Sequence, residues 1–234
     1  MVLELRPPHS DTLARMSSQA SAGREPVSFL VFAASLRSDS LNGRLAALAA
    51  RTLEENGGTV ELASMAQFVT DAYDQDLENE GTFPEGAARL RDALLACDGF
   101  VISSPEYNAS IPGVLKNSLD WVSRYRPQPL NELDGMLISA SPSMVGGNRG
   151  LWALRVPFEH LGARIHPDMF SLAQAHHAFA ADGGLEDEAL AQRFEATLVS
   201  FMDSVEAHKH YPCAKKTWFE YLGERPEAAT ERVE

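Results

Sequence analysis

One apolar run of strand length stands near the start of the sequence: Val27-Ser-Phe-Leu-Val-Phe-Ala-Ala34. A nearly continuous run of this kind is typical of a strand that is buried on both faces, as in a parallel sheet. The next segment, Leu41 to Glu55, carries leucine and alanine at helical spacing, and Gly57-Gly58 ends it. A buried strand that leads into an amphipathic helix predicts the first repeat of an α/β fold.

The same alternation continues along the chain. The other expected strands are Thr59 to Ala63, Gly99 to Ser103, Met136 to Ala140 and a last one that begins at Ala163 to Ile165. The other expected helices are Ala87 to Ala96, Val114 to Ser123, Gly150 to Leu161 and Glu186 to His208. The acidic stretch from Met65 to Pro84 has no clear period and is expected to be a long loop. This pattern predicts a doubly wound, five-stranded parallel sheet in a three-layer α/β/α arrangement.

Length and composition favour one domain. The chain has 234 residues, of which 44% are hydrophobic, and this is enough apolar material for one sizeable core. Residues 1–26 lack sustained periodicity and are expected to form a mobile N-terminal arm. The domain is therefore expected to cover residues 27–208, and residues 209–234 are expected to form a C-terminal extension.

Charge and cysteine content restrict the partners and the compartment. The formal net charge of −13 argues against general binding to nucleic acid or to an anionic membrane, because both need clustered lysine and arginine. Cys97 and Cys213 lie far apart, so a structural disulfide is not expected, and Cys97 beside an apolar strand is predicted to be buried. With no signal peptide and no membrane-length apolar run, the sequence predicts a cytoplasmic protein.

In doubly wound sheets ligands bind beyond the carboxyl ends of the strands, so three loops form the candidate site. The first is Ala34-Ser-Leu-Arg-Ser-Asp-Ser-Leu-Asn42. Its polar groups are the hydroxyls of Ser35, Ser38 and Ser40, the guanidinium of Arg37 and the amide of Asn42. A helix follows, and its free N–H groups favour an anion. The loop is compatible with a phosphate site and equally with simple N-capping by a residue from Ser38 to Ser40.

The second and third loops are rich in rigid and small residues. After the strand that ends at Ser103 come Pro105-Glu-Tyr-Asn108 and Ile111-Pro-Gly113, with Pro112 suited to a first helical turn. Such a loop could hold a planar heterocycle, or it could be a rigid connection in which Tyr107 packs. A lone Glu106 could also act as a general base. In the third loop, Ser139 to Gly150, the pair Gly146-Gly147 permits close backbone approach.

Together, the three loops resemble the NADPH-dependent FMN reductase family, which includes chromate-, quinone- and azo-reducing flavoproteins with a flavodoxin-like fold. The matching patterns are Ser-Leu-Arg-(x)2-Ser-(x)-Asn, then Pro-Glu-Tyr-Asn-(x)-Ser-Ile-Pro-Gly-(x)-Leu-Lys-Asn-(x)-Leu-Asp-Trp, then Ser-(x)4-Gly-Gly-(x)-Arg-Gly. The resemblance runs from about Val27 to His208. One departure is Ala34, which stands where the family usually has glycine.

The resemblance implies FMN as the cofactor and assigns residues to it. The phosphate would be bound by Ser35, Arg37, Ser40, Leu41 and Asn42. Pro105, Glu106, Tyr107 and Asn108 would line the isoalloxazine ring largely through main-chain atoms, and Ser141, Gly146 and Gly147 would complete the pocket. No catalytic side chain and no metal are expected, because the flavin supplies the chemistry.

The expected function is that of a cytoplasmic NAD(P)H-dependent FMN oxidoreductase with a ping-pong cycle. Hydride would pass from the nicotinamide to flavin N5, and electrons would then pass to quinone, azo, nitro or metal-oxyanion acceptors. The alternative is a flavodoxin-like electron carrier or a flavin-dependent regulatory module that acts on a protein partner. The resemblance also implies a homodimer or homotetramer. NADPH and NADH are not distinguished, since Arg37, Arg124 and Arg149 are only candidates for contact with a 2′-phosphate.

Three other patterns have simpler explanations. His176-His177, together with His208 and His210, matches no zinc spacing, so these residues are expected to be packed or solvated. A stripe at helical spacing is expected to be core or subunit interface; it comprises Leu190, Phe194, Leu198, Phe201 and Val205. Trp121 and Trp152, on two helices, are expected to be packing residues, with a subunit interface implied in their neighbourhood by the resemblance.

Overall fold

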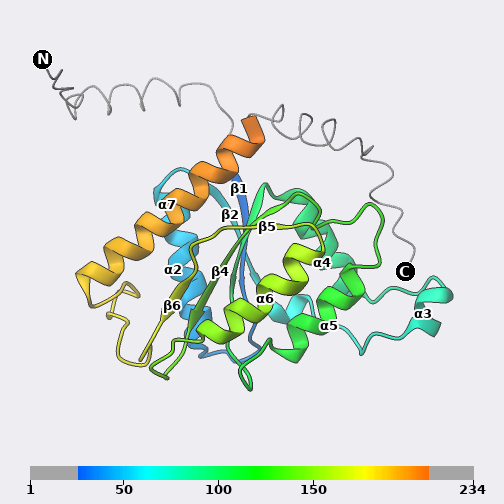
Figure 1. Ribbon diagram of the computed structural model, residues 1–234, viewed down its shortest axis with the longest axis horizontal. Helices are drawn as coiled ribbons and strands as arrows, with labels where there is room; N and C mark the ends of the chain where they lie inside the picture. Colours follow the sequence, from blue (N-terminus) through cyan, green and yellow to red (C-terminus); the bar gives the residue numbers. More distant parts are fainter. Residues whose placement is uncertain (1–25, 211–234) are drawn as a thin grey trace, which may run out of the picture.

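The computed structural model describes residues 26–210 and contains one parallel sheet flanked by helices (Figure 1). The strands are β1 (Ser28–Ala33), β2 (Thr59–Ser64), β3 (Gly99–Ser103), β4 (Asp134–Ala140), β5 (Arg164–Ile165) and β6 (Phe170–Leu172). Their order is β2-β1-β3-β4-β5, with β6 also paired to β4, and all pairs are parallel. This is the flavodoxin-like order, so the predicted doubly wound α/β fold is confirmed.

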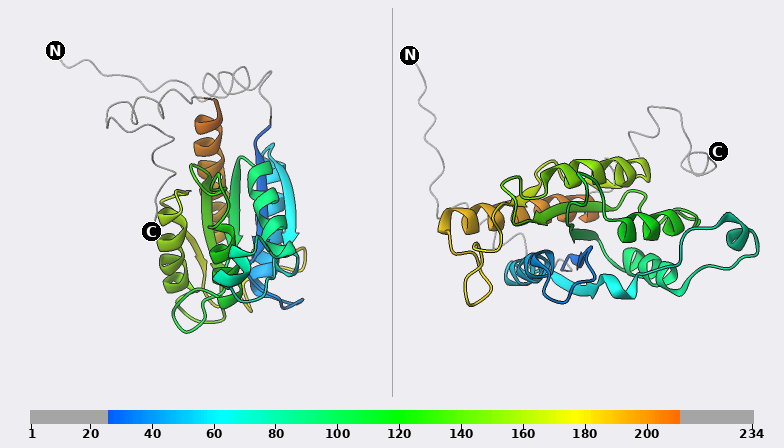
Figure 2. Two further views of the ribbon diagram at one scale, coloured as in Figure 1. Left: turned by 90° about the vertical axis from the view of Figure 1, so that its right-hand side faces the viewer. Right: turned by 90° about the horizontal axis from the view of Figure 1, so that it is seen from below.

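Helices lie between most successive strands and after the last one, and they cover both faces of the sheet. They are α2 (Leu41–Glu55), η1 (Met65–Gln67), α3 (Gln75–Asn79), α4 (Glu85–Ala96), α5 (Gly113–Val122), α6 (Asn148–His160) and α7 (Glu188–His210). Helices α2 and α7 pack on one face, and α4, α5 and α6 pack on the other (Figure 2). Along β1, Phe29 and Val31 belong to the first layer, whereas Leu30 and Phe32 belong to the second. A strand that is apolar throughout therefore supplies two cores.

The apolar stripe of α7 is confirmed as core of the subunit. Phe194, Leu198, Phe201 and Val205 are each at most 2% exposed, and Leu190 packs against the same cluster. Trp121 is fully buried, as expected, whereas Trp152 is 58% exposed in the subunit, so a packing role for Trp152 at the implied subunit interface stays a prediction. Trp152 lies on the outer side of α6, where the Arg155 guanidinium carbon lies 5.8 Å from the centroid of its ring.

The segment from Met65 to Pro84 was expected to be a loop, yet it contains η1 and α3. The side chain of Asp74 accepts a hydrogen bond from the Asp76 N–H and so caps α3. On the body of the protein, Asn117 of α5 donates from its amide to the carbonyls of Thr70 and Asp71. The segment is thus fixed at its base, while α3 lies away from the sheet (Figures 1 and 2).

The fifth strand position differs from the single strand that was expected. Two short segments fill it: β5 pairs with Asp134–Gly135, and β6 pairs with Ile138–Ala140, which gives a six-stranded sheet. Pro167 lies between them and cannot donate to a ladder, so the chain leaves the sheet there. Arg155 of α6 donates to the carbonyls of Ile165 and His166 at this break.

The remaining expectations concern the ends of the domain and the cysteines. Residues 1–25 of the expected arm and residues 211–234 of the expected extension, with Cys213, lie outside the described residues. Cys97 is partly buried, and burial raises the pKa of its thiol to about 12. Within residues 26–210, no helix combines the length and the apolar character that are needed to cross a membrane.

Candidate functional site

The three predicted loops begin side by side at the carboxyl edge of the sheet. The register pairs Ala33 at the end of β1 with Ser103 at the end of β3. Ser103 in turn pairs with Ile138 of β4, and the Ser104 N–H donates to the Ile138 carbonyl. The loops after β1, β3 and β4 therefore leave the sheet next to one another, at the switch point where α/β proteins bind ligands.

The first loop presents polar groups that its own helix does not use. Ser40 is the N-cap residue of α2, but its side chain makes no capping hydrogen bond with any described residue. The backbone N–H groups at the start of a helix have no intrahelical partners, and they point toward the loop. Arg37 pairs with Asp39 at 2.9 Å, and both side chains are at least 70% exposed. The Arg37 guanidinium holds the pKa of Asp39 below its ordinary value.

Asn42 has a structural contact that the sequence did not reveal. Its side chain is buried, and its Nδ2 donates to the carbonyl of Ala140 at 2.9 Å. Its Oδ1 accepts hydrogen bonds from the Ala140 N–H and the Ser103 hydroxyl, each at 3.0 Å. One amide thus joins the start of α2 to the ends of β3 and β4. If Asn42 contacts a phosphate, its main-chain N–H is the group available for that contact.

The second loop ends in a tight two-residue turn. Tyr107 and Ser110 exchange both backbone hydrogen bonds, at 3.1 and 3.0 Å. Asn108 and Ala109 between them have φ values of 52° and 60°. Two successive left-handed residues define a type I′ turn. Tyr107, at the start of this turn, is half-exposed.

Glu106, in the same loop, is not a free base. Its carboxylate pairs with Arg149 at 2.7 Å and also accepts the Gly150 N–H at 3.2 Å. Sequence reasoning placed Glu106 and Arg149 in separate loops and did not pair them. The rule that strand ends meet at one edge was the available signal, because it brings these two loops together.

The third loop packs closely on the end of β4 and on the second loop because of its glycines. Gly146 and Gly147 have φ values of 64° and 83°. A Cβ on Gly147 would lie 2.1 Å from the Ser139 hydroxyl oxygen, which is buried and has no hydrogen-bond partner within the described residues. Ser141 donates from its hydroxyl to that of Ser143 at 3.1 Å. The glycine pair is therefore required for the spacing of the loop.

Other candidates lie away from these loops. Arg124 binds Glu78 of α3, at 2.8 Å from its Nε, and is thus committed to the α3 segment. Hydrogen bonds from Tyr73 and Arg124 outweigh the effect of burial and hold the pKa of Glu78 below its ordinary value. Among residues 26–210, no group of three or more His, Cys, Asp or Glu side chains is placed to hold a metal ion. His208 instead contacts Asp134.

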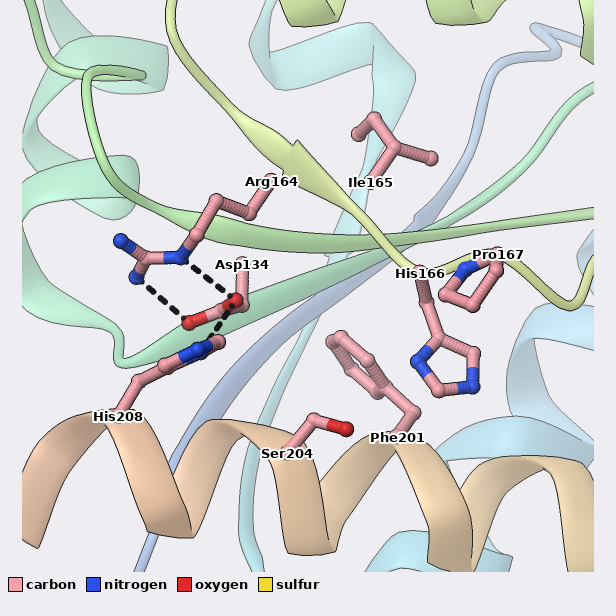
Figure 3. A pocket seen from close by; sticks show the side chains of 8 residues that line it. All are labelled: Asp134, Arg164, Ile165, His166, Pro167, Phe201, Ser204 and His208. Carbon is pink, nitrogen blue, oxygen red and sulfur yellow. Dashed lines mark hydrogen bonds and ion pairs between the residues drawn. The ribbon is translucent and has the colours of Figure 1, made fainter. Parts of the chain in front are cut away.

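A small cavity lies at the opposite, amino edge of the sheet (Figure 3). Asp134 lies between Arg164, which donates two hydrogen bonds to its carboxylate, and His208 of α7. His166 lines the same cavity, and burial lowers the pKa of its imidazole. Because Asp134 begins β4 and the loop residues follow its other end, this cavity is separate from the three-loop site.

A comparison with known families decides the assignment. The model of the family described as NADPH-dependent FMN reductase matches residues 27–177, more than half of the chain. The chain belongs to the NADPH-dependent FMN reductase family. The resemblance in the sequence is thereby confirmed, together with the assignment as an oxidoreductase that uses FMN and NADPH or NADH.

Individual relatives of this FMN reductase agree. It is 33% identical over 141 residues to a quinone reductase of Escherichia coli K12, which covers 60% of this chain and 74% of the relative. It is 33% identical to an NAD(P)H-dependent FMN reductase of Pseudomonas aeruginosa, over 70% of this chain and 87% of the relative. Among solved structures, a flavoenzyme NAD(P)H:(acceptor) oxidoreductase from Paracoccus denitrificans has 28% identity and a TM-score of 0.67, and the match covers 78% of this chain and 98% of that one.

The three-loop site of this FMN reductase fits the cofactor. The open N-terminus of α2, with Arg37 and the serine hydroxyls, suits a phosphate. The half-exposed ring of Tyr107 suits a flat ring system, and the buried glycines Gly146 and Gly147 let the third loop pack closely on β6 and Ser139 beside it. Each group is placed at a strand end that the topology brings to the same edge.

Proposed function

We propose that this FMN reductase passes electrons from NADPH or NADH to small oxidised acceptors, with quinones as the main class. The observation that carries the proposal is the convergence of three ligand-ready loops at the switch point, in a chain of this family. Relatives from E. coli, potato and Arabidopsis thaliana are named as quinone reductases or oxidoreductases. When bound, FMN takes a hydride from the nicotinamide and delivers the electrons to the acceptor.

The residues of the chain bind and orient, and none is required to move a proton. In this proposal the phosphate is held by the hydroxyls of Ser35 and Ser40, the guanidinium of Arg37 and the main-chain N–H groups of Leu41 and Asn42. The residues Pro105, Glu106, Tyr107 and Asn108 form one wall of the ring pocket, and Ser141, Gly146 and Gly147 form the other. Azo, nitro and metal-oxyanion compounds are further acceptors in the same class of reaction.

The test is reconstitution followed by steady-state turnover. The purified protein, mixed with FMN and freed of excess, is expected to keep the visible flavin spectrum and to oxidise NADPH or NADH with benzoquinone as acceptor. Arg37→Ala is expected to weaken FMN binding about tenfold or more, because it removes a charge-assisted contact. A protein that retains no FMN contradicts the proposal. Retained FMN without turnover, when no partner protein is added, favours the electron-carrier alternative.

We also propose a homodimer or homotetramer in the cytoplasm. An apolar surface on the outer side of α6 supports the assembly, because Trp152 and Val156 are 58% and 70% exposed and lie one helical turn apart. Sedimentation velocity is expected to give at least twice the monomer mass of 25.6 kDa, and Trp152→Glu is expected to lower it. A wild-type monomer that binds FMN fully would contradict the assembly. Recovery of the protein in the membrane fraction of lysed cells would contradict the cytoplasmic location.

A further inference from the structure

One carboxylate connects two of the three loops. Glu106 lies after β3, and Arg149 is the second residue of α6. The Nε of Arg149 donates to Oε1 of Glu106 at 2.9 Å, and a terminal nitrogen of the guanidinium lies 2.7 Å from the same oxygen. Oε2 accepts the N–H of Gly150 at 3.2 Å. Both oxygens of Glu106 are therefore used by the start of one helix.

The contact is packed as well as charged. The side chain of Glu106 is only 10% exposed, although that of Arg149 is 63% exposed. A Cβ on Gly150 would lie 3.1 Å from both Cα and Cβ of Glu106, so the helix start rests directly on the backbone of the second loop. A nearly buried carboxylate that loses its partner is much more costly than an exposed one.

The other arginine at this edge behaves differently. Arg37 pairs with Asp39 two residues away, within one loop, and both side chains are largely exposed. Such a pair is expected to open readily for a phosphate. The partners Glu106 and Arg149, by contrast, are 43 residues apart, and their contact fixes the spacing of two loops.

The charges of Glu106 and Arg149 also bear on the redox potential of bound FMN. Glu106 and Arg149 together are neutral, so the pair adds little net field at the site. Two-electron reduction of bound FMN to its anion adds negative charge, and a nearby unpaired charge therefore changes its redox potential. An unpaired carboxylate lowers this potential, and an unpaired guanidinium raises it.

We propose that Glu106 and Arg149 are positioning residues that form a neutral clamp between the two walls of the flavin pocket. The clamp sets the spacing of the walls and shields bound FMN from the charge of either partner. This inference rests on the proposed function, because it requires FMN at the three-loop site.

The experiment compares Glu106→Gln, Arg149→Gln and the double variant with wild type. The readouts are the FMN midpoint potential and the dissociation constant of FMN. In Arg149→Gln the potential is expected to fall, and in Glu106→Gln it is expected to rise. Each shift corresponds to a change of roughly threefold to tenfold in the ratio of affinities for oxidised and reduced FMN. The double variant is expected to return close to the wild-type potential while binding FMN more weakly.

Two controls separate the clamp from general destabilisation. Glu159→Gln removes one carboxylate from the same helix, where Glu159 pairs with Arg155, and is expected to leave the potential unchanged. Arg149→Lys keeps the charge and is expected to keep the potential, which also provides a reading if the glutamine variants fold poorly. If the substitutions acted only by distorting the pocket, the FMN midpoint potential would shift in the same direction in all variants.

The possible failures are distinguishable. Equal potentials in wild type and both single variants, or shifts of the same sign, overturn the clamp and leave the proposed function intact. Absence of FMN binding by the wild-type protein overturns the proposed function, and the clamp with it. Thermal melting of the FMN-free proteins adds a check that needs no flavin. Each single variant is expected to lower the melting temperature, and the sum of these two losses is expected to exceed the loss in the double variant. Full additivity counts against the contact.

Discussion

The two edges of the sheet use polar residues in opposite ways. At the amino edge, Asp98 precedes β3 and Asp134 begins β4, and each carboxylate is engaged by cations from the chain itself. Lys209 of α7 lies 2.8 Å from Asp98, and His208, the residue before it, lies 2.9 Å from Asp134. At the carboxyl edge, Ser38 and Arg37 are exposed, Tyr107 is half-exposed, and the first N–H groups of α2 have no partners within the helix.

The difference suits the two edges to different tasks: the amino edge to stabilising the fold, and the carboxyl edge to the ligand binding that we propose. Charges at the amino edge are satisfied internally and fasten the last helix to the sheet, so substitutions there are expected to change stability and not cofactor binding. Groups at the carboxyl edge are held by a few buried contacts, such as those of Asn42 and Glu106, while Arg37 and Tyr107 stay exposed. Variants at the two edges are therefore expected to separate stability from flavin affinity.

The largest effect is expected for Gly147→Ala at the carboxyl edge. The new Cβ would overlap the Ser139 hydroxyl at 2.1 Å, and the residue would keep a φ of 83°. We expect a loss of about 3 kcal/mol or more in the free energy of unfolding, together with weaker FMN binding. Urea unfolding and flavin fluorescence measure the two. Gly113→Ala is the control, because its Cβ would meet nothing within 4 Å; a comparable loss there would contradict the explanation.

A smaller effect is expected for Asn42→Ala. The substitution leaves the Ser103 hydroxyl and both backbone groups of Ala140 without their partner in a buried place. We expect a loss of about 2–3 kcal/mol in the free energy of unfolding and a clear rise in the FMN dissociation constant. Asn56→Ala is the matched control, since its amide donates only to Thr52 within its own helix. Equal effects at both positions would show that the strand ends do not depend on Asn42.

The smallest effect, and one confined to stability, is expected for Asp98→Asn at the amino edge. Burial alone would raise the pKa of Asp98, but hydrogen bonds from Lys209 and Ser28 hold it below its ordinary value of 3.8. The carboxylate therefore stabilises the fold above that pH, and the contribution is lost as pH falls through the native pKa.

At pH 7, Asp98→Asn is expected to cost about 1–2 kcal/mol, and the difference from wild type is expected to shrink below pH 4. Thermal melting across pH measures it. Asp92→Asn, on the exposed side of α4, is the control: it is expected to melt like wild type at every pH. A change in FMN affinity in Asp98→Asn, with stability retained, would break the contrast between the edges.

Much of the fold could be predicted because the strands carry their signal locally. Strands β1 and β3 are largely apolar, and helices of ordinary length alternate with the strands, so a parallel sheet with helices on both faces follows from the pattern, whereas the flavodoxin-like fold was implied by the family resemblance. The double segment β5 and β6 could not be predicted in this way. Each is two or three residues long, and each exists only because β4 lies beside it. Helix α3 was missed because its acidic composition hid a local signal, the cap at Asp74.

The candidate site divides along a similar line. The loops were predictable, since they follow the strand ends, and family motifs named their residues. The contacts that hold the loops were not predictable, because they join distant positions. Asn42 reaches residues 61 and 98 positions away, and its amide gives no sign in the sequence of whether it will contact a ligand or the backbone. The structure shows that the Asn42 amide contacts the backbone of Ala140 and the Ser103 hydroxyl.

The type I′ turn at Asn108 and Ala109 has a consequence for the speed of recognition. A left-handed alanine costs about 1 kcal/mol more than glycine in the same conformation, but it also narrows the range of shapes available to the free chain. Because Tyr107 and Ser110 already exchange both hydrogen bonds, the wall has its shape before a ring arrives. Little conformational entropy is then left to lose on binding. If this turn forms a wall of the cofactor site, as we propose, we expect the rate of cofactor capture to be governed by encounter and not by the folding of a loop around the ring.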